Sequence, residues 1–136
     1  MADEEPPIRV DGLDLVEYAS MLPIYEEALR RWPEDREVLL WLGHACTRLG
    51  RIEEGLRADL ALTALLPADP TVRYNLACSL ALLGRTDEAL SALETAVRLG
   101  YRDIDHLRRD DDLRALHGHP RFQALTDPHP DPSAPA

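Results

Sequence analysis

The amino-acid sequence predicts an all-α protein built from repeated pairs of antiparallel helices. Apolar residues recur at helical spacing along most of the chain, and this pattern repeats after about 34 residues. Gly50 and Gly84 interrupt it at equivalent places, where each is predicted to adopt the left-handed conformation just past a helix end. One helix pair cannot cover its own apolar face, so we expect successive pairs to stack.

Identical residues at one fixed offset define the repeat. Leu42 matches Leu76, and Gly50 matches Gly84, in each case one repeat length later. The same offset relates Leu49 to Leu83, Arg51 to Arg85, Glu54 to Glu88, Leu56 to Leu90, Ala58 to Ala92, Leu65 to Leu99 and Asp69 to Asp103. Because the matches span two whole units, they indicate a repeated structure and not one local motif.

Each unit is predicted to contain two helices. The first helices carry apolar stripes made of Leu39, Leu42, Cys46 and Leu49 in one unit and of Val72, Leu76, Leu80 and Leu83 in the next. Second helices are predicted over residues 53–66 and 87–99, and Thr86 is expected to cap the latter.

The repeat register divides the chain into six segments. They are a disordered N-terminus (1–11), a degenerate N-terminal half-repeat (12–35), two full repeats (36–69 and 70–103), a C-terminal helical cap (104–127) and a disordered Pro-rich tail (128–136). Pro6, Pro7 and Pro23 disfavour a complete first hairpin. Residues 14–20 are therefore predicted as a short helix, with Ser20 as the N-cap of the helix that follows.

The composition argues against several functions. A formal net charge of -10 disfavours a general affinity for nucleic acid or anionic membranes, which requires clustered Lys and Arg. No stretch approaches the roughly 18 apolar residues of a membrane helix, and the acidic start of the chain does not resemble a signal peptide. Cys46 and Cys78 lie among apolar residues, which is typical of reduced cysteines in a cytoplasmic protein.

The small and apolar residues of both units also match a known pattern. The matching positions hold Leu39, Leu42, Gly43, Cys46, Gly55, Asp59, Leu62 and Pro67, and then Arg73, Leu76, Ala77, Leu80, Ala89, Leu93, Ala96 and Tyr101. The chain thereby resembles the tetratricopeptide repeat family, whose repeat is about 34 residues long. This resemblance implies a right-handed α-solenoid of about 2.5 repeats plus C-terminal capping helices.

Two residues depart from the family pattern. Asp59 stands where a large apolar residue is usual, and Leu62 stands where Ala is usual. Packing of the helix over residues 53–66 then requires Leu56 or Leu60 to turn inward.

Family members receive a peptide or a partner helix on the concave surface lined by their first helices. Carried over position by position, the resemblance implies a groove lined by Glu37, Leu40, Trp41, His44, Arg48, Thr71, Tyr74, Asn75, Cys78, Leu82, Asp105, Arg108, Arg109 and Asp112. We expect Trp41 and Tyr74 to anchor the partner; the alternative is that both pack against the preceding helix pair. As anchors, their joint replacement by Ala would weaken binding by about 2 kcal/mol and leave the melting temperature nearly unchanged.

A carboxylate clamp is not predicted. One subfamily holds a C-terminal carboxylate with two Lys, two Asn and one Arg, and the equivalent positions here are Leu40, His44, Asn75, Asp105 and Arg109. Asn75 and Arg109 alone match. Arg108 and Arg109 either meet an acidic peptide end or pair with the acidic run at 110–112.

No catalytic site, metal site or cofactor is predicted. His117, His119 and His129 are the candidate metal ligands, but Pro120 interrupts any helix that would hold the first two, and no zinc motif accompanies them. The acidic run at 110–112 precedes an apolar stretch, where negative charge favours a helix start. Glycines are isolated from one another, and no serine lies in a nucleophile elbow.

The predicted function is therefore that of a non-enzymatic adapter or assembly factor in the cytoplasm, which binds a peptide or helix of another protein. Two alternatives remain open: a dedicated chaperone that shields an apolar segment of a client, and a module that associates with itself through the exposed end of the stack.

Overall fold

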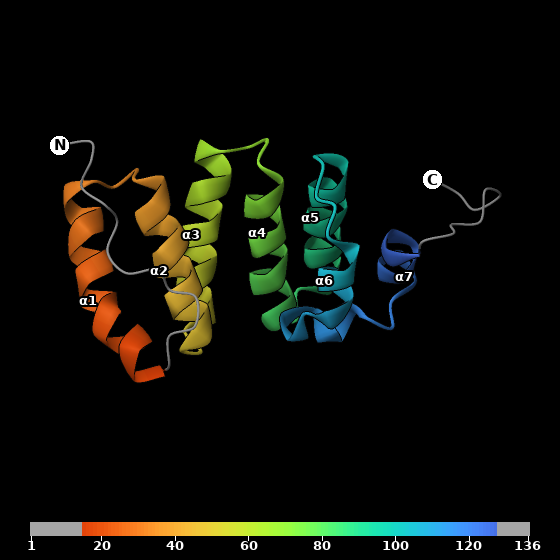
Figure 1. Ribbon diagram of the computed structural model, residues 1–136, viewed down its shortest axis with the longest axis horizontal. Coiled ribbons are helices and arrows are strands. Elements are labelled where there is room, and N and C mark those ends of the chain that lie inside the picture. Colours follow the sequence, from red (N-terminus) through yellow and green to blue (C-terminus); the bar gives the residue numbers. More distant parts are fainter. Residues whose placement is uncertain (1–14, 128–136) are drawn as a thin grey trace. The chain divides into compact units, whose positions relative to one another are not determined.

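The computed structural model describes residues 15–127, and all regular structure in that range is helical (Figure 1). The helices are α1 (Leu15–Arg31), α2 (Arg36–Arg48), α3 (Ile52–Leu65), α4 (Pro70–Leu82), α5 (Thr86–Arg98), α6 (Ile104–Arg109), the 3-10 helix η1 (Asp111–Leu116) and α7 (Pro120–Thr126). The predictions of disorder for 1–11 and 128–136 fall outside the described residues. The chain divides into two compact units, Met1–Pro67 and Ala68–Ala136.

The first unit contains α1, α2 and α3, each packed against the next along the chain. Its core includes Tyr18 and Tyr25 from α1 and Val38, Trp41 and Cys46 from α2. Tyr25 is completely buried. The apolar face of α2 thus lies against α1 on one side and α3 on the other.

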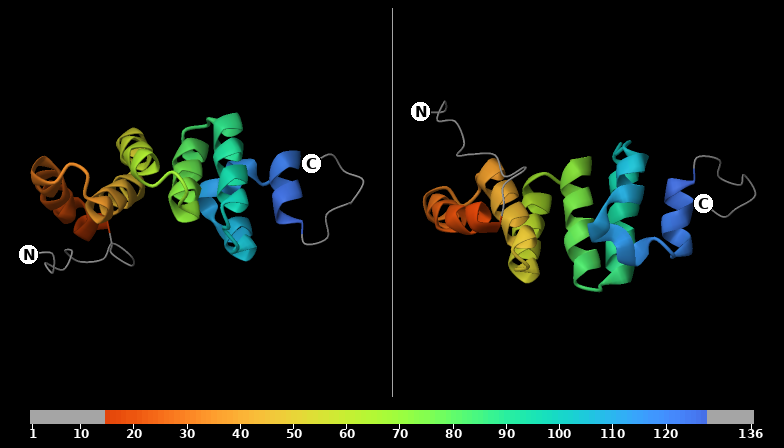
Figure 2. Two further views of the ribbon diagram at one scale, coloured as in Figure 1. Left: turned by 90° about the horizontal axis from the view of Figure 1, so that it is seen from above. Right: turned by 60° about the horizontal axis from the view of Figure 1, so that its bottom comes forward.

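The second unit contains the α4–α5 hairpin and three short helices. η1 packs on α4, and α7 packs on α5 and α6 (Figure 2). Leu107, Leu113 and Leu116 are fully buried, so each of the segments α6 and η1 contributes to the core. Arg121 of α7 binds both carboxylate oxygens of Glu94 in α5, at 2.6 and 3.1 Å.

Three aspartates, each one repeat length from the next, begin the first helix of each repeat. Asp35 caps α2 by accepting from the Val38 amide, and Asp69 caps α4 by accepting from the Thr71 and Val72 amides. Asp103 caps α6 in the same way. Each carboxylate satisfies a backbone amide at a helix N-terminus, and its charge is favourable there.

A glycine with positive φ follows each of the helices α2, α4 and α5. The sequence predicts two of these glycines, Gly50 and Gly84. Gly50 and Gly84 have φ values of 79° and 75°, in the left-handed region, and Gly100 has 114°. The following amide closes the helix end in each hairpin: Arg51 donates to the Cys46 carbonyl at 2.8 Å, and Arg85 donates to the Leu80 carbonyl at 2.9 Å.

The C-terminal segment is a shortened repeat. α6 begins one repeat length after α4, and α7 begins one repeat length after α5. The position equivalent to the buried Leu76 is Asp110, and there the helix breaks. Asp110 ends α6 and caps η1 by accepting from the Asp112 amide. The polar Asp110 thus stands at a position that is apolar in the preceding repeat. Its presence explains why this segment has three short helices instead of two long ones.

Two local predictions were wrong. α1 is one continuous helix that passes through Pro23, and Ser20 lies within it, donating to the Val16 carbonyl instead of capping a helix. The loss of one backbone hydrogen bond at Pro23 is offset by the burial of Met21 and Tyr25 beside it. Thr86 is the first residue of α5 and not its cap.

Small residues let the two helices of each hairpin cross closely. A Cβ added to Gly55 in α3 would lie 3.1 Å from the Gly43 carbonyl oxygen of α2 and 2.9 Å from the Thr47 hydroxyl. The equivalent positions in the second hairpin hold Ala77 and Ala89, both completely buried. In α3, Leu56 is buried as expected, and the unusual Asp59 is itself buried while Leu60 stays exposed.

We predict that Gly55→Ala destabilises the protein by about 1–3 kcal/mol, because the new methyl group would crowd the Thr47 hydroxyl and the Gly43 carbonyl oxygen across the α2–α3 crossing. Gly118→Ala is the control, since no atom lies within 4 Å of its added Cβ. Urea unfolding followed by circular dichroism measures both. Equal stabilities of the two variants would show that the crossing tolerates a larger residue.

Candidate partner-binding surface

One face of α2 is open in the first unit. Glu37, Leu40 and Arg48 are exposed. His44, which lies between Leu40 and Arg48 in the sequence, is half-buried. Leu40 is 37% exposed, while Leu39, its neighbour on the core side, is buried. The face therefore combines one accessible apolar side chain with an acid, an imidazole and a guanidinium.

His44 is held in place by α1. The Tyr18 hydroxyl and His44 Nε2 lie 3.2 Å apart, and the two rings meet edge to face with centroids 5.7 Å apart. This contact holds the imidazole against α1, where it is half-buried. A partner would therefore meet an ordered histidine at this place.

Trp41 does not offer an exposed aromatic surface. Its side chain is 9% exposed and belongs to the core of the first unit, with its ring 6.0 Å from that of Tyr25. Trp41 thus packs against the preceding helix, α1, which is the alternative interpretation of the sequence. Replacing Trp41 with Ala is therefore expected to lower stability, contrary to the expectation from sequence.

The corresponding face of α4 is partly covered by the chain itself. Thr71 and Leu82 are exposed and Asn75 is half-buried, whereas Tyr74 and Cys78 are buried. Leu82 is 40% exposed. The covering residue is Asp110, whose carboxylate accepts a hydrogen bond from the Tyr74 hydroxyl and lies 3.8 Å from Cys78 Sγ.

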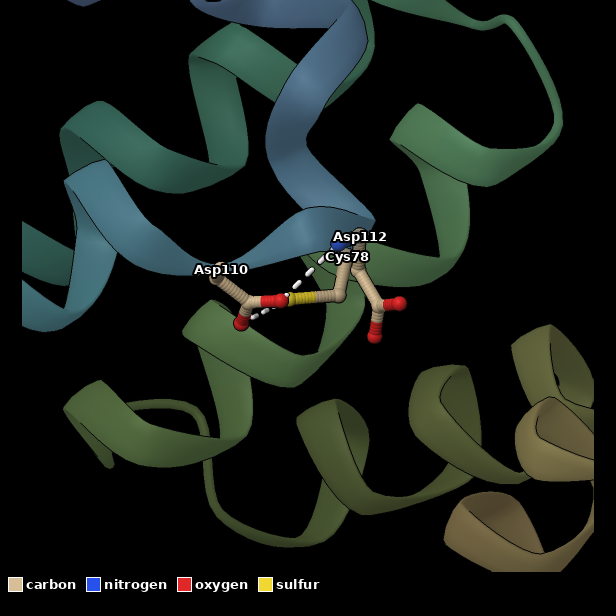
Figure 3. A group of neighbouring side chains, drawn as sticks. All are labelled: Cys78, Asp110 and Asp112. Atoms are coloured by element: carbon tan, nitrogen blue, oxygen red, sulfur yellow. Dashed lines mark hydrogen bonds between the residues drawn. The ribbon is translucent and has the colours of Figure 1, made fainter.

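Asp110 joins the shortened repeat to α4 (Figure 3). One carboxylate oxygen accepts from the Asp112 amide at 2.9 Å, and the other faces Tyr74 and Cys78. His106 Nε2 lies 3.5 Å from the same carboxylate. The side chain thereby caps η1 and fixes that helix against α4.

Tyr74 also stacks on Tyr101. The two rings are nearly parallel, with centroids 4.7 Å apart, and the His106 ring lies 5.5 Å from that of Tyr74. Burial raises the pKa of Tyr74 well above that of free tyrosine, and Cys78 and Asp110 add to the shift. Burial and the nearby Asp103 carboxylate raise the pKa of Tyr101 to about 12. Tyr74 is thus a neutral hydrogen-bond donor in a packed cluster.

Arg108 and Arg109 differ in their surroundings. Arg108 donates to the Thr126 carbonyl and lies 3.6 Å from the Asp105 carboxylate on its own helix. Arg109 is exposed, as is Asp105. Arg108 is exposed too, and its contact with Thr126 helps hold α7 on α6.

One group of side chains has metal-ligand spacing among the described residues. Cys78 Sγ and carboxylate oxygens of Asp110 and Asp112 lie within 4.8 Å of one another. Both oxygens of Asp110 already accept hydrogen bonds from the protein, from Tyr74 and from the Asp112 amide. This geometry is accounted for by packing, and the absence of a metal requirement stays a prediction.

The histidines near the C-terminus have structural roles. His119 caps α7 by accepting from the Arg121 amide at 3.2 Å, and the His117 ring packs on Phe122 with centroids 4.9 Å apart. His129 lies outside the described residues. The buried Cys46 thiol has its pKa raised to about 11, mainly by burial, so it is protonated at neutral pH.

Comparison with known families gives the class of protein. Models of the tetratricopeptide repeat match residues 18–71 and 70–99, which together make up more than half of the chain. The chain belongs to the tetratricopeptide repeat family and is a protein-interaction module. No helix in residues 15–127 has both the length and the apolar character needed to cross a membrane.

A curated relative shares part of this sequence. The chain is 33% identical over 96 residues to a protein of Arabidopsis thaliana that is named as chloroplastic. The match covers 66% of this chain and 28% of that protein, so the chain spans less than a third of the relative's length.

Sequence reasoning missed Asp110 as the residue that closes the α4 face. A signal was present, because Asp110 lies one repeat length after the apolar Leu76, and Asp112 lies at the same offset from Cys78. Tyr18 was also missed, because it precedes the first clear repeat.

We predict that Tyr74→Phe lowers the free energy of unfolding by about 2 kcal/mol, since it removes a buried hydrogen bond to a carboxylate and keeps the ring on Tyr101. Tyr101→Phe is the matched control and should change stability by less than about 0.5 kcal/mol. Chemical denaturation of both variants measures the difference. An equal effect of the two substitutions would contradict the role given to Asp110.

Alkaline pH is expected to destabilise the second unit. The folded-state pKa values of Tyr74 and Tyr101 lie above the unfolded value of about 10, so the native state holds these protons more tightly. The contribution of these raised pKa values to the free energy of unfolding is fully present below pH ~10 and is lost as the pH rises above that value. Melting temperatures between pH ~9 and ~12 should fall less steeply for Tyr74→Phe than for the wild type, and parallel curves would count against this assignment.

Proposed function

We propose that the chain is a non-enzymatic adapter or assembly factor that binds a peptide or helix of a partner protein on the open faces of α2 and α4. The observation that supports this is the row Glu37, Leu40, His44 and Arg48 on α2, in which an exposed apolar side chain lies among polar ones. Such a mixture suits a segment with one apolar anchor and flanking polar groups.

The face of α4, in the second unit, is a further proposed binding face. Thr71, Asn75 and Leu82 are accessible there, and Arg109 of α6 adds an exposed positive charge. The expected ligand for this part is a segment with a carboxylate near an apolar residue, because Arg109 favours the first and Leu82 the second. In this proposal Tyr74 and Cys78 support the surface from beneath.

Two finer parts of the proposal concern catalysis and location. The absence of enzymatic activity is supported by the burial of both thiols, and in particular by the protonated state of Cys46 at neutral pH. A cytoplasmic location is proposed on the basis of the reduced cysteines. The name of the relative refers to the chloroplast, so imaging of a tagged chain in its native cell tests this part directly.

A display library of random peptides selected on the wild-type protein tests the binding proposal without knowledge of the partner. Leu40→Glu should weaken the selected peptides at least about tenfold, because it places a charge at the proposed apolar anchor. Leu60→Glu is the matched control, since Leu60 is an exposed leucine on α3, outside the proposed face. Fluorescence anisotropy measures the affinities.

The pattern of the selected peptides separates two functions. Peptides that share a fixed arrangement of an apolar residue and charges support an adapter, whereas peptides united only by apolar content support a chaperone for apolar segments. Equal binding to the wild type, Leu40→Glu and Leu60→Glu would exclude the α2 face as the binding surface.

A further inference from the structure

Two histidines flank the turn that joins η1 to α7. His117 and His119 lie on either side of Gly118, and α7 begins at the next residue, Pro120. Both imidazoles contact α7: His119 at its first turn, and His117 through Phe122. The two side chains are half-buried. Uptake of a proton by either ring therefore acts directly on the place where α7 begins.

His119 holds α7 through a ring nitrogen that carries no proton. Its Nδ1 atom accepts a hydrogen bond from the Arg121 amide at 3.2 Å, as the Asp35 and Asp69 carboxylates do for the amides at the start of α2 and α4. The bond exists only while the imidazole is neutral, because a protonated ring has no acceptor. Protonation also puts a positive charge at the helix N-terminus, where positive charge is unfavourable.

The surroundings of His117 also suit a neutral ring. Its Nε2 atom is buried, and within residues 15–127 it has no hydrogen-bond partner. The ring packs on Phe122, which is 3% exposed. A protonated imidazole has two N–H donors, so one of them would be left buried without an acceptor, which is costly. The packed position of α7 thus favours the neutral form of both histidines.

The charged groups of α5 near this turn are already engaged. Glu94 is close enough to His119 for an electrostatic interaction, but it is held by two guanidinium nitrogens of Arg121, at 2.6 and 3.1 Å, and also lies near Arg98. Asp87 is 3.9 Å from the same guanidinium of α7. Because these cations neutralise Glu94, it offers a protonated His119 little compensation for the lost cap.

The charged groups of η1 and α6 form pairs of their own. Arg114 of η1 lies 2.7 Å from Asp111, and Arg108 of α6 lies 3.6 Å from Asp105. Arg108 also donates to the Thr126 carbonyl at the far end of α7. Within residues 15–127, no carboxylate is at ion-pair distance from either imidazole of the turn, so neither η1 nor α6 stabilises the protonated form.

We propose that the turn at residues 117–119 is a pH-sensitive hinge, in which neutral imidazoles hold α7 against α5 and α6 and protonation loosens it. Free imidazole takes up a proton near pH ~6.5. The docked arrangement disfavours that proton, so docking is complete above pH ~7 and weakens as the pH falls through ~6. Loosening uncovers the apolar surface on which Phe122 now packs. The inference goes beyond the proposed function, since neither histidine belongs to the faces of α2 and α4 assigned to partner binding.

Amide hydrogen exchange of the full chain, followed by NMR at pH ~7.5 and ~5.5, tests the hinge, because these values lie on either side of imidazole titration. Protection factors are compared, since they remove the intrinsic effect of pH on exchange. The amides of residues 123–126 should lose protection on the order of tenfold at the lower pH, the size expected for a lost N-cap. The amides of α5 serve as the internal reference and should change much less.

Two conservative substitutions assign the effect to the hinge. His119→Asn keeps a capping oxygen that accepts at both pH values, and His117→Gln keeps a polar side chain that does not titrate. Each should remove part of the pH dependence of α7 protection, and the double variant should remove nearly all of it. His106→Gln is the matched control, because His106 contacts Asp110 and Tyr74 instead of the start of α7, and it should behave like the wild type.

Three results would overturn the inference. One is an equal protection of α7 at both pH values in the wild type. Another is a loss of protection that spreads equally over α5 and α7, as general acid unfolding would produce. The third is a loss in the His119→Asn variant, alone or with His117→Gln, that is as large as in the wild type.

Discussion

The close crossing of two helices within each hairpin is the constraint on which the rest of the structure depends. Gly43 and Gly55 permit it in the first unit, and Ala77 and Ala89 permit it in the second. The crossing fixes which residues of each first helix turn inward and which remain accessible. Leu40 stays exposed on α2 because Leu39 and Trp41 already occupy the core side of the helix.

The C-terminal helices and α1 differ in how their apolar residues are covered. At the C-terminal end the chain closes its own surface: Asp110 joins η1 to α4, and Arg121 joins α7 to α5. Hydrogen bonding to Arg121 lowers the pKa of Glu94, so the pair is ionised at neutral pH. At the other end, Ile24 remains half exposed on α1.

Much of the fold could be predicted from the sequence because it depends on local signals repeated at a fixed spacing. Gly50 and Gly84 ended helices as expected, and the positions of α2 to α5 followed from the repeat register. The candidate site was harder to predict. Position on a helix indicates which way Trp41 and Tyr74 point, but their exposure depends on other segments, namely Tyr25 in α1 and Asp110 after α6.

Family membership defines this protein as a protein-interaction module, and the proposed binding face follows from what its hairpins leave uncovered. The most direct test is a titration of the dilute ¹⁵N-labelled protein with a selected peptide, followed by backbone amide shifts. The account predicts that the largest changes occur at Leu40, His44 and Asn75, with little change at Leu60 or Ile24. Changes confined to α1, or to the exposed faces of α3 and α5, would contradict it.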